Sequence, residues 1–219
     1  MKTNQEYKDA ALAALKGNWP NAVVASLILF LGALLFAGGN SLTEILHLQP
    51  GVVASVSGVS FLLIIFILGP LEMGLVNAFR ELYEIGNPDV VSSMFRIGFG
   101  RYGHILWVYV LMEIKILLWT LLLIVPGIIK SFAYAMAPYI AIEHPEYSAS
   151  ECIAESEKMM KGHKFDLFWL DLSFIGWILL SIVTLGIGYF WLIPYMSTAQ
   201  AVFYNDLKAG LAGSVEVTE

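Results

Sequence analysis

The chain has 219 residues, of which 58% are hydrophobic and only 14% are charged, and its formal net charge is −6. Soluble domains carry about 25% charged and 45–50% apolar residues, and a chain of this size has too little interior to hide the excess. The composition therefore excludes an ordinary soluble globular protein and predicts apolar surface that faces a lipid bilayer. We expect no nucleic acid among its partners.

Six apolar stretches follow one another along the chain, and about 20 apolar residues are needed for a helix to cross the hydrocarbon core of a bilayer. Pro126 and Gly127 predict a tight turn between the third and fourth, and the glycines of residues 184–188 predict another between the last two. We expect an all-α fold with six transmembrane helices arranged as three hairpins, in one domain over residues 1–208 followed by a short cytoplasmic tail, 209–219. The predicted spans are residues 20–38, 52–79, 104–125, 127–143, 165–185 and 187–205.

Basic residues gather on one side of this topology. The three opposite connections, 39–51, 126–127 and 184–188, contain neither Lys nor Arg. The positive-inside rule assigns the basic side to the cytoplasm, which predicts a multi-pass protein of the cytoplasmic membrane with both termini inside. The basic residues on that side are Lys2, Lys8, Lys16, Arg80, Arg96, Arg101, Lys158, Lys161, Lys164 and Lys208.

Amphipathic helices are expected on the cytoplasmic surface. One covers residues 9–16, and a second begins after Ser148, which forms a capping box with Glu151 three residues later. Its apolar side would carry Cys152, Ser156, Met159, Met160 and His163 at helical spacing. Cys152 is the single cysteine, so an internal disulfide is excluded.

The chain contains a weak internal repeat. A glycine-containing joint precedes each odd-numbered span, and the even-numbered span that follows contains a proline. The prolines are Pro70, Pro138 and Pro194. Proline inside a membrane helix frees a carbonyl group and bends the axis. The three bends either frame a central cavity or fit tilted helices together, and the sequence leaves both interpretations open.

Ionisable residues within the spans are candidates for function, because burying a charge in lipid is costly. Glu113 and Lys115 lie near the middle of the third span, and Glu72 follows Pro70 in the second. Two residues apart on a helix, Glu113 and Lys115 do not face each other. Glu72, Glu113 and Lys115 are therefore the predicted ligand site, with interhelical pairing or snorkelling as the alternative, and Asp171 is a structural candidate near the inner surface.

The remaining polar motifs are weaker signals. Lys158, Lys161 and Lys164 either contact anionic lipid head groups or only set the topology. Residues 98–103 match G-x-G-x-x-G, but no strand precedes them, so we expect a flexible joint instead of a nucleotide site. The four histidines lack metal-ligand spacing, so neither a metal nor a cofactor is expected; they are His47, His104, His144 and His163.

Several short segments in fixed order resemble an uncharacterised family of bacterial integral membrane proteins, domain of unknown function 975. They are residues 123–130 (LIVPGIIK), 160–164 (MKGHK), 172–177 (LSFIGW) and 184–188 (TLGIG), followed by Pro194 and Tyr195. The resemblance covers roughly residues 100–208. It implies a bacterial cytoplasmic-membrane protein with about six spans, and it implies no activity and no catalytic residues.

No enzyme signature accompanies these features, because G-x-S-x-G, H-E-x-x-H and paired metal-binding aspartates are all missing. We expect a non-enzymatic module that binds or transports a small or amphipathic ligand. The alternative is a membrane scaffold or an accessory subunit of a larger complex. Small residues on the second and fourth spans permit close helix contacts, inside the monomer or with a second copy or another membrane protein.

Overall fold

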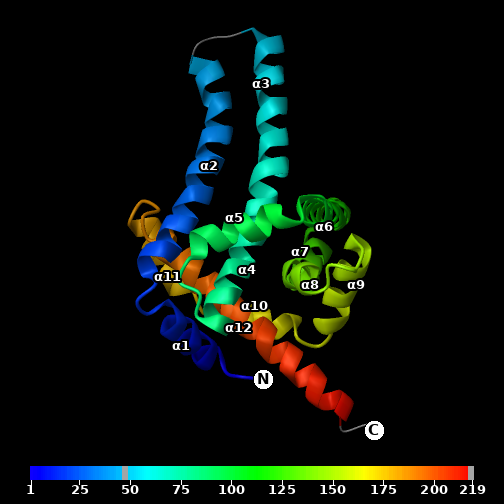
Figure 1. The fold of residues 1–219 in the computed structure, drawn as a ribbon. Coiled ribbons are helices and arrows are strands. Elements are labelled where there is room, and N and C mark those ends of the chain that lie inside the picture. Colours follow the sequence, from blue (N-terminus) through cyan, green and yellow to red (C-terminus); the bar gives the residue numbers. More distant parts are fainter. Residues whose placement is uncertain (46–48, 217–219) are drawn as a thin grey trace.

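The computed structural model describes residues 1–45 and 49–216, and every regular element in these ranges is a helix (Figure 1). The predicted all-α fold is therefore confirmed for this part of the chain. The elements are α1 (Asn4–Leu15), α2 (Trp19–Ile45), α3 (Pro50–Leu63), the π-helical turn η1 (Ile64–Leu68), α4 (Gly69–Ile85), α5 (Val90–Gly100), α6 (Tyr102–Leu122), α7 (Ile124–Tyr134), α8 (Ala137–Glu143), α9 (Ala149–Met159), α10 (Lys164–Leu172), α11 (Ile175–Val183) and α12 (Tyr189–Glu216).

Four helical stretches are long and apolar enough to cross a membrane, judged by length and composition within the described residues. A fifth is added if α1 and the apolar part of α2, which meet at 99°, are counted as one bent span. The four are Val53–Ile85, Tyr102–Leu122, Ile124–Glu143 and Lys164–Val183. They support a membrane protein with four or five apolar helices, and α12, where we expected the sixth span, is not among them.

The apolar hairpins are not all parallel. In Figure 1, α2 and α3 run side by side and project from the rest of the molecule, whereas α6 and α7 are seen almost end-on in the same view. The α2–α3 pair and the α6–α7 pair therefore cross. Between them, α5 runs across the base of the α2–α3 hairpin and leads into α6.

The turn between α6 and α7 lies three residues before the predicted one. Leu123 is the single extended residue, with φ −160° and ψ 137°, and α7 begins at Ile124. Pro126 sits in the first turn of α7, where a missing N–H leaves no hydrogen bond unmade. Gly127 lies against Thr120, and a Cβ at this position would overlap the Thr120 side chain. The glycine is therefore needed for the close contact of the two helices.

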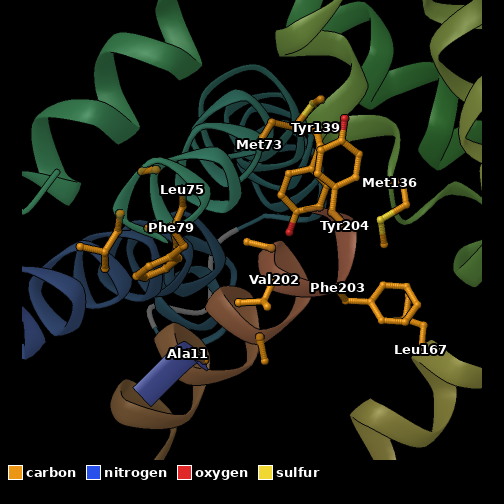
Figure 2. Packing of buried hydrophobic residues seen from close by; sticks show 14 of the residues in the cluster. Ala11, Met73, Leu75, Phe79, Met136, Tyr139, Leu167, Val202, Phe203 and Tyr204 are labelled. Carbon is orange, nitrogen blue, oxygen red and sulfur yellow. The ribbon is translucent and has the colours of Figure 1, made fainter. Parts of the chain in front are cut away.

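The core is built around α12. Its residues from Ala199 to Tyr204 include five that are at most 1% exposed and that point in all directions around the helix axis. Figure 2 shows side chains from α1, α4, α8 and α10 meeting those of α12, and the rings of Tyr139 and Tyr204 stack with centroids 4.6 Å apart. Burial on all sides places this half of α12 inside protein and away from lipid.

Two of the three prolines sit where a helix deviates from α geometry. Pro70 follows η1 in the long helix, and because it has no N–H it leaves the carbonyl of Phe66 without its usual donor. The hydroxyl of Tyr102 donates to that carbonyl at 2.9 Å. Pro138 lies at the start of α8, after a break at residues 135–136. Pro194 lies inside α12.

Both predicted surface helices are present, and the first, α1, begins at Asn4 instead of residue 9. The side chain of Ser148 accepts from the N–H of Glu151 at 3.3 Å, and the carboxylate of Glu151 accepts from the N–H of Ser148 at 2.6 Å. The predicted apolar side of α9 is buried at Cys152 and Ser156, and Met160 just after the helix is also buried. Such packing fixes α9 on the protein.

The N-terminal helix α1 packs along the C-terminal half of α12. Asp206 accepts hydrogen bonds from the hydroxyl of Tyr7 at 2.6 Å and from the N–H of Lys2 at 2.8 Å. Lys8 donates to the carbonyl of Ser173 at 2.7 Å, at the junction of α10 and α11. These hydrogen bonds hold α1 against α12 and against the junction of α10 and α11.

Candidate functional site

An open apolar groove of about 370 Å³ lies between α2, α4 and α12, and Glu72 is in its wall. Leu29 and Phe30 of α2, Leu75 of α4 and Ile193 of α12 supply apolar surface. Glu72 is exposed, and it is the one ionisable residue among the residues that line the groove. The arrangement combines a large apolar surface with a single carboxylate, which is the usual composition of a site for an amphipathic molecule.

Glu113 lies near Glu72 across the contact between α4 and α6. The ring of Tyr109 packs directly on Gly69, one turn before Glu72, and Tyr109 is one turn before Glu113 on α6. The carboxylates of Glu72 and Glu113 are within electrostatic range of each other and of Tyr109. The structure therefore brings together two of the three residues predicted for the ligand site.

Lys115 is not joined to this pair. Its side chain is half-buried, and among the described residues no ion pair or hydrogen bond connects it to Glu72 or Glu113. This agrees with the expectation that Glu113 and Lys115 do not face each other. Asp171 accepts a hydrogen bond from Gln200 at 3.0 Å, which links α10 to α12 and fits the structural role expected for it.

Residues close to two of the three prolines line the groove. Leu68 and Glu72 flank Pro70 in the chain, and Ile193 and Ser197 are close to Pro194. Pro138 does not line this groove. The idea that all three prolines frame one cavity is therefore not supported, whereas two of them lie close to an open groove.

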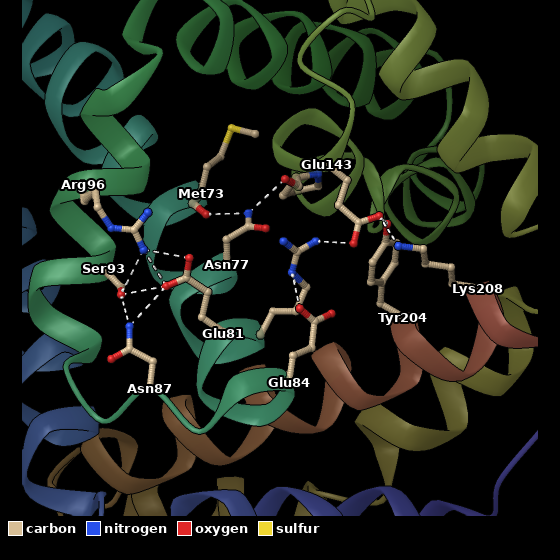
Figure 3. A network of polar contacts seen from close by, with 12 residues as sticks. Met73, Asn77, Glu81, Glu84, Asn87, Ser93, Arg96, Glu143, Tyr204 and Lys208 are labelled. Carbon is tan, nitrogen blue, oxygen red and sulfur yellow. Dashed lines mark hydrogen bonds and ion pairs between the residues drawn. The ribbon is translucent and has the colours of Figure 1, made fainter.

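A network of polar contacts around Arg80 and Glu143 was missed by the sequence analysis (Figure 3). Arg80, only 7% exposed, pairs with Glu143 at 2.8 Å, and Glu143 also accepts from Tyr204 at 2.8 Å and from Lys208 at 2.7 Å. The cluster joins the ends of α4 and α8 to α12. Arg80 and Glu143 lie at the ends of the second and fourth predicted spans and carry opposite charges. These opposite charges at the same end of two spans are the signal that could have predicted the pair.

Further polar groups surround this ion pair. Buried Asn77 donates to the carbonyl of Pro138 at 2.9 Å, and Glu81 on the other side of α4 accepts from Arg96 at 2.7 Å and from Ser93 at 2.8 Å. These contacts hold α4, α5 and α8 in register. Because the charged groups are paired with one another, the cluster is a structural centre and not an open reaction site.

The lysines predicted to contact head groups lie around the end of α9. Lys158 and Lys161 are exposed and Lys164 is half-buried. Lys158 is 3.2 Å from Glu155 in the same helix, which compensates its charge. No further contact tests their predicted role.

The other sequence candidates do not form reactive sites in the described residues. No group of three His, Cys, Asp or Glu side chains there has the geometry to hold a metal, and His47 lies outside the described residues. Residues 98–103 form the end of α5, the joint at Arg101 and the start of α6, with no strand before them. Burial raises the pKa of the Cys152 thiol to about 11, which keeps it protonated at neutral pH.

Comparison with known proteins agrees with the motifs of the C-terminal half. The family model described as "Protein of unknown function (DUF975)" matches residues 120–210, which include all of the quoted segments. No curated protein and no solved structure matches the chain. Residues 120–210 of this chain are thus a DUF975 region, as the resemblance predicted.

Proposed function

We propose that this protein is a non-enzymatic, multi-pass protein of the bacterial cytoplasmic membrane that binds or transports a small amphipathic ligand in the groove beside Glu72. The observation that carries the proposal is the single carboxylate in the wall of a 370 Å³ apolar groove. Apolar walls favour an apolar body, and the carboxylate selects a positively charged or hydrogen-bond-donating head.

The neighbouring carboxylate strengthens the preference for a cation. Glu72 and Glu113 repel each other when both are ionised, and this repulsion is strong in a medium of low dielectric constant. A cation beside them relieves the repulsion and favours the ionised form of both. We therefore place Glu72 in direct contact with the ligand and Glu113 behind it, and Lys115 outside the site.

The proposed topology keeps six spans with both termini in the cytoplasm. Its support is the one-sided distribution of Lys and Arg together with the four or five helical stretches that are long and apolar enough to cross a membrane. Single cysteines in place of Asn40 and Gly213, introduced on a Cys152→Ala background, test it by labelling in sealed vesicles. The proposed topology predicts labelling from opposite faces, and labelling from the same face would contradict it.

Two hydrophobic ions of the same shape and opposite charge test the ligand site. The purified protein in nanodiscs should bind tetraphenylphosphonium more tightly than tetraphenylborate. Two unit charges about 6 Å apart attract each other by about 3 kcal/mol at an effective dielectric constant of about 20, so Glu72→Gln should weaken tetraphenylphosphonium binding by up to about 100-fold. The same variant should not weaken tetraphenylborate binding, because it removes a charge that repels the anion. Glu155→Gln, at a half-buried carboxylate on α9, is the matched control and should bind like the native chain.

Two outcomes would overturn the ligand-binding proposal. One is equal affinity of the native chain and Glu72→Gln for tetraphenylphosphonium. The other is no preference of the native chain for the cation over the anion. In either case the scaffold hypothesis would be the remaining one, and recovery of a stoichiometric partner from native membranes would then be its test.

A further inference from the structure

The joint between α5 and α6 has two arginines around a small cavity that the proposed ligand site does not use. The cavity has a volume of about 180 Å³ and is lined by Arg96, Gly100 and Arg101, with aliphatic side chains of α6 and α8 behind them. Cavities of this size accept a group such as a phosphate. The question is whether the arginine charges are available to an anion.

Arg101 is exposed, and among the described residues its side chain forms neither an ion pair nor a hydrogen bond. Arg96 pairs with Glu81 at 2.7 Å, but 60% of its side chain stays exposed. Glu146 is within electrostatic range of Arg101, and its carboxylate is bound to His144 at 2.9 Å. The carboxylates near the cavity are therefore already engaged, and Arg101 remains free to bind an anion.

Beside these arginines, three aromatic rings form a continuous row, of which the first two are exposed and Tyr102 is half-buried. The rings of Phe95 and Phe99 are nearly parallel with centroids 6.3 Å apart, and those of Phe99 and Tyr102 are 5.9 Å apart. Phe95 is 41% and Phe99 39% exposed. A helix with aromatic residues on one side and arginine on the neighbouring side is typical of segments that lie in the head-group region of a membrane.

The direction of α5 fits this position. It runs across the α2–α3 hairpin and across α6, which are themselves crossed (Figure 1). With the α2–α3 hairpin along the membrane normal, α5 lies close to the plane of the membrane. Tyr102 anchors the joint through its hydrogen bond to the carbonyl of Phe66, so the aromatic row is held at the base of the long helix.

We propose that the α5–α6 joint binds the phosphate head group of an anionic phospholipid. Arg101 and the exposed edge of Arg96 contact the phosphate, and Phe95 and Phe99 lie among the acyl chains of the same leaflet. This site is separate from Lys158, Lys161 and Lys164, which lie around the C-terminal end of α9. The inference rests on the membrane location in the proposed function, and it does not depend on a ligand at Glu72.

The test measures binding of phosphatidylglycerol and phosphatidylcholine to the full chain in mixed micelles by native mass spectrometry. Each guanidinium group near an anionic head group contributes about fivefold in affinity, so Arg101→Gln should weaken phosphatidylglycerol binding about fivefold and leave phosphatidylcholine unchanged. Arg101→Gln breaks no internal contact, so the variant should unfold at the same temperature as the native chain. Lys16→Gln, which removes an exposed cation just after α1, should bind like the native chain.

Two further arms separate the alternatives. Phe95→Ser combined with Phe99→Ser should weaken both lipids, and glycerol 3-phosphate should not compete with phosphatidylglycerol at equal concentration. Unchanged phosphatidylglycerol binding in Arg101→Gln, loss of binding in Lys16→Gln instead, or equal competition by glycerol 3-phosphate would each overturn the proposal. Glu72→Gln should leave lipid binding intact, so failure of the Glu72 groove and failure of this site are distinguishable.

Discussion

Ser156 closes the break between α7 and α8, and its removal should destabilise the protein strongly. The hydroxyl of Ser156 donates to the carbonyl of Ala133 at 2.9 Å and accepts from the N–H of Met136 at 3.1 Å. In an unbroken helix these two backbone groups would form hydrogen bonds inside the helix, but the helix is interrupted just before Pro138. Ser156 is fully buried, so water cannot replace its hydroxyl.

The expected magnitude follows from two orphaned backbone groups. A buried polar group left without its partner costs about 1–3 kcal/mol, so Ser156→Ala should lower the free energy of unfolding by about 2–6 kcal/mol. The stretch is apolar enough to lie in lipid, where unpaired backbone groups are especially costly. Unfolding of the purified protein in mixed micelles, followed by circular dichroism during titration with dodecyl sulfate, measures this difference.

Ser131→Ala is the matched control for this prediction. Its hydroxyl donates to the carbonyl of Ile128 within the same helix turn and bridges no break, so the loss should stay within about 0.5 kcal/mol. Hydrogen exchange of the Met136 amide should become faster in Ser156→Ala and stay unchanged in Ser131→Ala. A loss in Ser156→Ala no larger than in the control, with the Met136 amide still protected, would refute the reasoning.

Two other predictions concern packing and pH. Gly74→Ala places a Cβ 2.9 Å from the backbone nitrogen of Gly98 and against the neighbouring carbonyl, so it should lower the free energy of unfolding by about 1–3 kcal/mol. Gly58→Ala, with open space around it, should leave this free energy unchanged or raise it by up to about 1 kcal/mol. Equal effects of the two variants on unfolding in micelles would contradict the close approach of α4 and α5. Burial raises the pKa of Asp206, but the hydrogen bonds from Tyr7 and from a backbone N–H outweigh it and hold the pKa below its usual value. The stabilisation that ionised Asp206 contributes should therefore be complete above pH ~4, the pKa of Asp in the unfolded chain, and be lost as the pH falls through the folded pKa. Asp206→Asn should make the free energy of unfolding less dependent on pH in the acid range. An unchanged pH dependence would show that α1 is held by other contacts.

The sequence predicts the helices well, because apolar length and turn residues are local signals. The turn at residues 184–188 is where we expected it, with Leu185 at φ 54° and Gly186 at φ 88°. The turn between α6 and α7 was misplaced by three residues. Pro126 was interpreted as the end of a helix, but proline is also favourable in the first turn of one.

The candidate site was predicted only in part, because tertiary contacts decide which charges meet. Composition identifies Glu72 and Glu113 as costly residues within apolar helices, but it gives no information on which helix faces which. The contact of Tyr109 with Gly69 brings the two carboxylates together, and among the described residues no ion pair or hydrogen bond joins Lys115 to them. Arg80 was counted only as a topology signal, although its burial against Glu143 makes it part of the core.

The backbone structure around the three prolines also depends on tertiary contacts that the sequence does not reveal. Each was predicted to free a carbonyl in a return helix, and all three lie in helices, but their local structures differ. Pro70 follows a π-helical turn whose free carbonyl binds Tyr102, 36 residues away, and Pro138 starts a new helix after a break that Ser156 closes from α9. Because each deviation is stabilised by a different distant side chain, the proline pattern predicts where helices deviate and does not by itself indicate three copies of one unit.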